Sequence, residues 1–132
     1  MVTTGFLRSD RLMIGCSLDA HVGDFDGIIE AKCPLPATHL SYLRSGVVPL
    51  NYLQQITHNM WIANADWADF VSFNPDFPEQ LQLKVVRIAR NSLNMPEYIE
   101  KAVTFLQEVD DEYAAVQELM GPSVVWKGAK AA

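Results

Sequence analysis

The chain has 132 residues, of which 49% are hydrophobic and 20% charged, and its formal net charge is −6. This length suits one domain, and the apolar fraction excludes a disordered chain. No apolar run approaches the roughly 20 residues that cross a bilayer, so we expect no membrane partner. The acidic balance argues against binding nucleic acid through bulk charge. Cys16 and Cys33 show no pairing pattern, which favours a reducing, cytoplasmic compartment.

The first third of the chain predicts short strands. Residues 6–8 form a first candidate, and apolar residues alternate over 12–18, so that Asp19 follows on the polar face. The segment HVGDFDG, residues 21–27, is typical of a turn. Residues 28–33 predict the next strand, which two prolines end.

The remainder predicts helices around two further strands. A helix capped near Thr38 should end at Gly46, and a second helix should begin near Pro49. Strands are expected over 67–73 and 81–89. A long final helix follows, with an apolar stripe that either packs in the core or forms an oligomer seam. The stripe comprises Ile99, Ala102, Leu106, Val109, Tyr113, Val116 and Met120.

Three charged residues form the candidate chemical site. Glu30 and Lys32 share one strand face, and Asp19 joins them if the two strands around the turn are antiparallel neighbours. Two carboxylates and the carbonyl of Ala31 are hard oxygen ligands that suit Mg²⁺ or Mn²⁺. Lys32 would orient or deprotonate a water, or neutralise developing charge. The alternative interpretation is a solvated strand face with an ordinary Glu–Lys pair.

Other reactive side chains fit structural roles. The three histidines are not spaced as a metal set and are expected at the surface or in loops. Cys33 is expected to be a buried structural thiol on the strand face opposite Lys32. The apolar face of residues 12–18 points away from the charged site, and we expect it to be left uncovered, so that the chain self-associates or needs a partner.

The spacing of Asp19, Glu30, Ala31 and Lys32 matches the PD-(D/E)XK nuclease motif. The surrounding sequence resembles the phage-lambda-exonuclease-type family of YqaJ-like viral recombinases. The resemblance lies in three stretches: IGCSLDAHVGDFDGIIEAKCP, HLSYLRSGVVPLNYLQQITHNMW and WADFVSFNPDFPEQLQLKVVRIAR. The resemblance covers roughly residues 5–115. Two departures stand out. Leu18 and Ala20 replace a proline and a glycine around the aspartate, and the sequence starts close to the first expected strand, so we expect either a fragment or a shortened relative without the family's upstream helical region.

The resemblance implies an α/β fold with a mixed sheet: a restriction-endonuclease-like core with flanking helices and without the first helix. It implies a nuclease-like domain over residues 1–120 and a flexible tail over 121–132. The implied activity is Mg²⁺-dependent exonuclease hydrolysis from duplex DNA ends, in phage or prophage recombination in the bacterial cytoplasm. The alternative is a non-catalytic nuclease-like module for DNA binding or regulation, with an incomplete metal site.

The resemblance also assigns roles to single residues. Asp19 and Glu30 would be the metal-binding carboxylates, the Ala31 carbonyl a further ligand, and Lys32 the catalytic lysine. Gln55 matches a glutamine beside the catalytic centre, and Tyr52 would support the same wall. Tyr52 and Arg44, which the sequence places between two helices, are candidate DNA contacts. The implied partners are duplex DNA ends, a single-strand annealing protein and further copies of the chain.

Overall fold

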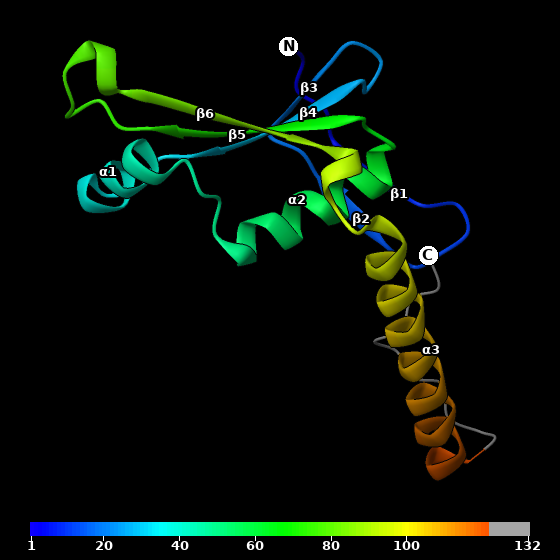
Figure 1. Ribbon diagram of the computed structural model, residues 1–132. Coiled ribbons are helices and arrows are strands. Elements are labelled where there is room, and N and C mark those ends of the chain that lie inside the picture. Colours follow the sequence, from blue (N-terminus) through cyan, green and yellow to red (C-terminus); the bar gives the residue numbers. More distant parts are fainter. Residues whose placement is uncertain (122–132) are drawn as a thin grey trace. The chain divides into compact units, whose positions relative to one another are not determined.

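The computed structural model describes residues 1–121 (Figure 1). The tail predicted over 121–132 lies outside the described residues except for Gly121. The chain divides into two compact units, residues 1–95 and a second that begins at Pro96. The first unit contains β1 (Phe6–Arg8), β2 (Gly15–Ser17), β3 (Ala20–Val22), β4 (Gly27–Lys32), α1 (Pro36–Ser45), α2 (Leu50–Ala63), β5 (Trp67–Phe73), the short helix η1 (Glu79–Leu81), β6 (Leu83–Ala89) and the short helix η2 (Arg90–Ser92).

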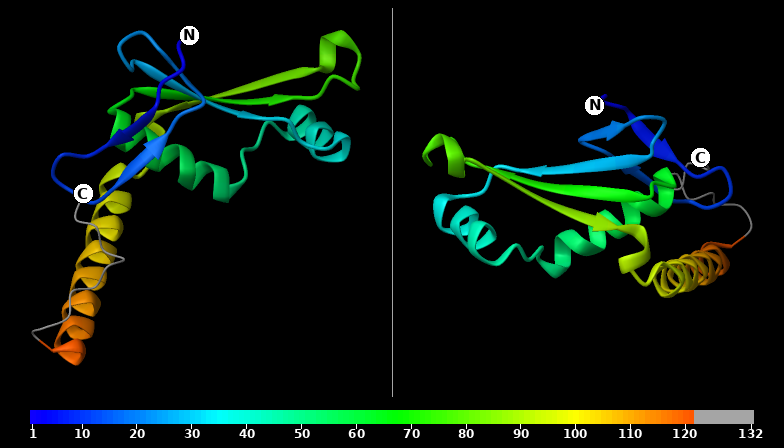
Figure 2. Two further views of the ribbon diagram at one scale, coloured as in Figure 1. Left: turned by 180° about the vertical axis from the view of Figure 1, so that it is seen from behind. Right: turned by 45° about the horizontal axis from the view of Figure 1, so that its top comes forward.

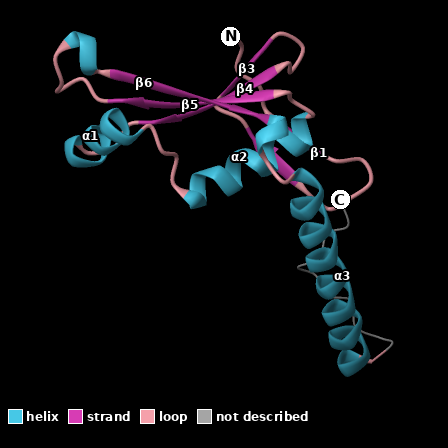
Figure 3. Ribbon diagram, viewed as in Figure 1, coloured by secondary structure: helices cyan, strands magenta, loops and turns pink. Residues whose placement is uncertain are grey.

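A four-stranded mixed sheet in the order β3-β4-β5-β6 forms the centre of the first unit (Figure 3). β3 pairs with β4 in antiparallel fashion, β4 with β5 in parallel, and β5 with β6 in antiparallel fashion. The parallel pair requires a long crossover, and α1 and α2 supply it. The mixed α/β fold expected from the sequence is therefore confirmed.

Both crossover helices lie on one face of this sheet (Figure 2). The alternation along β5 shows which face they cover, because Ala68, Phe70 and Ser72 are buried whereas Phe73 is exposed. The core between the helices and the sheet consists of Ile28, Tyr42, Ile56, Met60, Ala68, Phe70 and Ile88. The strand expected over 67–73 has the predicted bounds because its period-two pattern is uninterrupted.

The helix ends follow backbone chemistry that the sequence partly predicted. Gly46 ends α1 in the left-handed conformation with φ 62°, as expected for a glycine at this position. Asn64, with φ 54°, does the same for α2. Arg90 adds a clamp, since its Nη1 donates to the carbonyls of Met60 and Ala65 at 2.9 and 3.0 Å.

The predicted strand over residues 12–18 is wrong in extent. Ile14 donates its N–H to the carbonyl of Leu12 at 2.8 Å, and this three-residue turn breaks the extended run. Only β2 remains extended, and it pairs with β1 in a separate two-stranded sheet. The strand that pairs with β4 is instead β3, which occupies the start of the predicted turn.

Three expectations about side-chain burial are also wrong. His39, expected at the surface, is fully buried; its Nδ1 forms a 2.7 Å hydrogen bond with Ser72 Oγ, and its ring meets that of Phe77 edge-on. Cys33, expected to be buried, is exposed, since the sheet face that it continues carries no helix of the first unit. The apolar run over 12–18 is not an uncovered face, because Cys16 and Leu18 are each only 6% exposed.

The helix α3 (Met95–Met120) begins at the last residue of the first unit, and from Pro96 onward it belongs to the second. It carries seven acidic residues and one basic residue. Pairs one turn apart brace its surface: Lys101 Nζ lies 2.6 Å from Glu97 Oε1, and Gln107 donates to Asp111 at 2.9 Å. Within residues 1–121, no helix combines the length and the apolar character needed to cross a membrane.

Candidate active site

Asp19 lies one residue before β3, where the pairing of that strand with β4 ends. Its Oδ2 accepts a hydrogen bond from the backbone N–H of Ala31 at 2.8 Å, although the residue is otherwise exposed. The Asp19 side chain therefore accepts the backbone N–H that a further residue of β3 would otherwise pair with on β4. This contact fixes the first carboxylate beside the second, on β4.

Glu30 and Lys32 lie on the face of β4 that the helices cover. Glu30 is only 3% exposed, and its Oε1 forms an ion pair with Lys32 Nζ. A carboxylate buried to this extent must be paired, because leaving a charge unpaired in the interior is strongly unfavourable. The interpretation of a solvated strand face is therefore excluded for Glu30.

Lys32 has a second neighbour, the aromatic ring of Tyr52 on α2. The ammonium nitrogen lies 4.7 Å from the ring centroid, within the range of a cation–π contact. Tyr52 in turn stacks on Phe70 of β5, with ring centroids 5.7 Å apart and an interplanar angle of 28°. The lysine is thus held between a carboxylate of its own strand and a ring of the crossover helix.

The pKa of Lys32 reflects these contacts. Burial lowers the pKa of Lys32. The hydrogen bond and charge of Glu30, together with the charge of Asp19, raise it by more, so that the pKa stands above its usual value. The side chain is therefore a cation near neutral pH. Of the roles expected for it, orienting a water or neutralising negative charge fits this state better than removing a proton.

The two remaining predicted residues lie on the crossover helices. Gln55 is exposed and follows Tyr52 by one turn of α2, which places both on the same flank of the helix. Arg44 is exposed in the last turn of α1. The structure thus brings Asp19, Ala31, Glu30, Lys32 and Tyr52 together through direct contacts. Gln55 and Arg44 are placed on neighbouring elements.

Sequence reasoning missed the buried groups that support this site. Phe70 pairs with Glu30 in the β4–β5 register and forms the base beneath Tyr52. Ser72 pairs with Lys32 in the same register and contacts His39 of α1. The alternation along residues 67–73 indicated that Phe70 and Ser72 share a buried face. Their pairing with Glu30 and Lys32 follows only from the placement of β5 beside β4.

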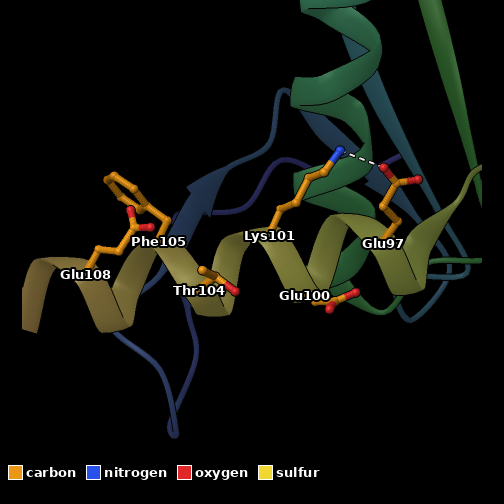
Figure 4. Close-up of a pocket in the computed structure, with 6 residues that line it drawn as sticks. All are labelled: Glu97, Glu100, Lys101, Thr104, Phe105 and Glu108. Carbon is orange, nitrogen blue, oxygen red and sulfur yellow. Dashed lines mark hydrogen bonds and ion pairs between the residues drawn. The ribbon is translucent and has the colours of Figure 1, made fainter.

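The donor set is small and consists of oxygen. Residues 1–121 hold no cluster of three or more histidine, cysteine, aspartate or glutamate side chains that would bind a metal. Asp19, Glu30 and the Ala31 carbonyl are two carboxylates and one backbone oxygen, a set suited to a hard cation that keeps part of its water shell. The second unit carries the surface hollow shown in Figure 4. The residues that line it are Glu97, Glu100, Lys101, Thr104, Phe105 and Glu108.

Comparison with known proteins identifies the family. The model of the YqaJ-like viral recombinase domain matches residues 1–66, half of the chain, and the chain belongs to this family. The matched segment contains every predicted site residue and ends just before β5. Phe70 and Ser72 therefore come from the part of the fold beyond the match.

Solved structures agree with this assignment. An alkaline exonuclease, LHK-Exo, from Laribacter hongkongensis is similar at 28% identity with a TM-score of 0.83, over 90% of this chain and 61% of that one. LHK-Exo in complex with dAMP gives a TM-score of 0.82 at the same identity and coverage. The chain thus spans about three-fifths of the length of these structures. A search of curated proteins gives no match.

Proposed function

We propose that this chain is the catalytic core of a DNA exonuclease that hydrolyses phosphodiester bonds from duplex ends with Mg²⁺ or Mn²⁺. The observation that carries this proposal is the convergence of Asp19, buried Glu30 and Lys32 at one end of the β3–β4 hairpin. Membership of the viral recombinase family and similarity to an alkaline exonuclease support it.

The backbone of β4 supports the same metal site. A strand residue directs its N–H and C=O to the same side of the strand, as antiparallel pairing requires. The Ala31 N–H faces Asp19, so the Ala31 carbonyl faces the same edge, beyond the end of β3. Asp19, Glu30 and this carbonyl would hold the cation.

Each residue then has a defined task. A divalent cation supplies charge stabilisation at the scissile phosphate and a more acidic water. Lys32, as a cation, would stabilise the negative charge that develops on the phosphate. Glu30 pairs with the lysine as well as binding the cation, and the Ala31 N–H holds Asp19 in place. Gln55 would take part at the catalytic centre from α2, and Arg44 would contact the DNA strand from α1.

The family also suggests partners for the complete protein. Duplex DNA ends are the proposed substrate, and a single-strand annealing protein and further copies of the chain are proposed associates. The proposed setting is phage or prophage recombination in the bacterial cytoplasm.

The decisive experiment compares digestion of linear and closed circular duplex DNA by the purified chain, with Mg²⁺ or with a chelator. We expect the linear form alone to be degraded, and only with the metal. Glu30→Gln should abolish both this digestion and Mn²⁺ binding measured by calorimetry.

Asp69→Asn is the matched control, because Asp69 is a partly exposed carboxylate of the adjacent strand β5 that pairs with Arg87. It should preserve metal binding and digestion. Mn²⁺ binding that persists in Glu30→Gln would remove Glu30 from the metal site. Binding of DNA ends without cleavage by the wild-type chain would favour a non-catalytic nuclease-like module.

A further inference from the structure

Lys32 makes two contacts of different kinds, and only one of them is to a group that would also bind the metal. The first is the ion pair with Glu30, and the second is the contact with the face of the Tyr52 ring at 4.7 Å. Under the proposed function Glu30 also binds the cation. A carboxylate whose charge is shared with a divalent cation attracts an ammonium less strongly, because the two positive charges compete for it.

The Tyr52 ring has no such competing role and is itself fixed in place. It stacks on Phe70, which is fully buried, and Phe70 meets the ring of Tyr42 edge-on at 5.4 Å and 89°. Phe70 is also the register partner of Glu30 on the neighbouring strand. The ring that faces Lys32 therefore rests on β5, the strand paired with the one that carries the carboxylate.

We infer that Tyr52 is a positioning residue that holds the Lys32 ammonium through the face of its ring while Glu30 binds the cation. This assignment rests on the proposed function and deepens it. A lysine side chain has four rotatable bonds, so a single weakened ion pair would release it into many rotamers. The ring face restricts these rotamers without withdrawing charge from the lysine.

The first test reads the contact directly and needs no catalysis. Protons above an aromatic ring face are shielded, so the ε-methylene signal of Lys32 in a ¹³C-labelled sample should lie upfield of that of Lys101. Loss of the signal in Lys32→Met assigns it. The upfield position should persist in saturating Mg²⁺ and in Tyr52→Phe, which keeps the ring. It should vanish in Tyr52→Leu, with Tyr52→Met as the substitute if the leucine variant fails to fold.

The second test measures digestion of linear duplex DNA. Tyr52→Leu should lower kcat about tenfold with little change in KM, the range that a partly desolvated cation–π contact supports. Tyr52→Phe should stay within about twofold of wild type on the same grounds. Tyr113→Leu, an equal change on α3, is the control and should match wild type.

The outcomes separate this inference from the proposed function. A Lys32 signal that coincides with that of Lys101, or one that is lost in Mg²⁺, overturns the inference whether or not the chain digests DNA. A phenylalanine variant as defective as the leucine variant also overturns it, since the hydroxyl would then be the active group. A leucine variant that raises only KM would make Tyr52 a DNA contact instead. A wild-type chain that digests no DNA defeats the proposed function, and the spectrum still decides the contact.

Discussion

The two faces of the four-stranded sheet differ in how their charged side chains are buried and paired. On the helix-covered face, Glu30 is buried and pairs with Lys32, two residues along the same strand. On the opposite face, Asp69 and Arg87 pair across strands through two 2.8 Å hydrogen bonds, and the guanidinium lies 3.8 Å from the ring centroid of Trp67. Asp69 and Arg87 satisfy each other, whereas the Glu30–Lys32 pair adjoins a second carboxylate, that of Asp19, and the carbonyl of Ala31. Burial beside further oxygen ligands distinguishes a candidate catalytic centre from a surface ion pair.

The largest expected effect contrasts two phenylalanines of β5. Phe70 is fully buried against the helices, and Phe73 is 39% exposed. Phe70→Ala should lower the free energy of unfolding by about 3–5 kcal/mol, because it leaves a cavity that the surroundings fill only in part. Phe73→Ala should cost less than about 1 kcal/mol. Urea unfolding followed by circular dichroism measures both, and equal losses would mean that the two faces are equally well packed.

A smaller effect is expected where Trp67 lies against β4 on the other face. A Cβ added at Gly27 would come within 2.2 Å of the Trp67 indole, whereas one added at Gly5 would meet nothing within 4 Å. Gly27→Ala should therefore lower the free energy of unfolding by about 1–3 kcal/mol as the indole is displaced. Gly5→Ala is the control in the same urea titration. An unchanged unfolding midpoint in Gly27→Ala would show that the indole moves aside freely.

The smallest effect concerns thiol reactivity and leaves stability almost unchanged. Cys33 is exposed, whereas Cys16 is buried and its pKa is raised to about 11 by that burial. Because the thiolate is the reactive form, Cys33 should react quickly with a chromogenic disulfide at pH 8, and Cys16 only slowly. Cys33→Ser should remove the fast phase. A fast phase that survives this substitution would place Cys16 in contact with solvent.

The sequence predicted the elements well where its patterns were local. The strand at residues 67–73, the glycine that ends α1 and the start of α2 after Pro49 all follow from short-range patterning. The extended run over 12–18 failed because its apolar alternation continues through a three-residue turn at Ile14. Alternation records the direction of side chains, but a tight turn can preserve the alternating pattern while breaking the strand.

The site was predictable in its composition and only partly in its surroundings. The spacing of Asp19, Glu30 and Lys32 predicted that they would lie at one end of a hairpin, and in the structure Asp19 contacts the Ala31 backbone N–H while Glu30 pairs with Lys32. Period two could not reveal which face the helices cover, so the burial of Glu30 was open until the crossover was placed. The Tyr52 ring reaches Lys32 only because the segment of residues 34–66 folds back over β4. The two residues are 20 positions apart in the sequence.

The parallel pairing of β4 with β5 also has a kinetic consequence. The β3–β4 and β5–β6 hairpins join neighbouring segments and can form early, but their union must wait for the whole α1–α2 crossover to close. Asp19, Glu30 and Lys32 belong to the first hairpin, whereas the ring beneath Tyr52 belongs to the second. The acidic residues and the aromatic base therefore lie on separate hairpins, and the complete site arises only when the two halves of the sheet join.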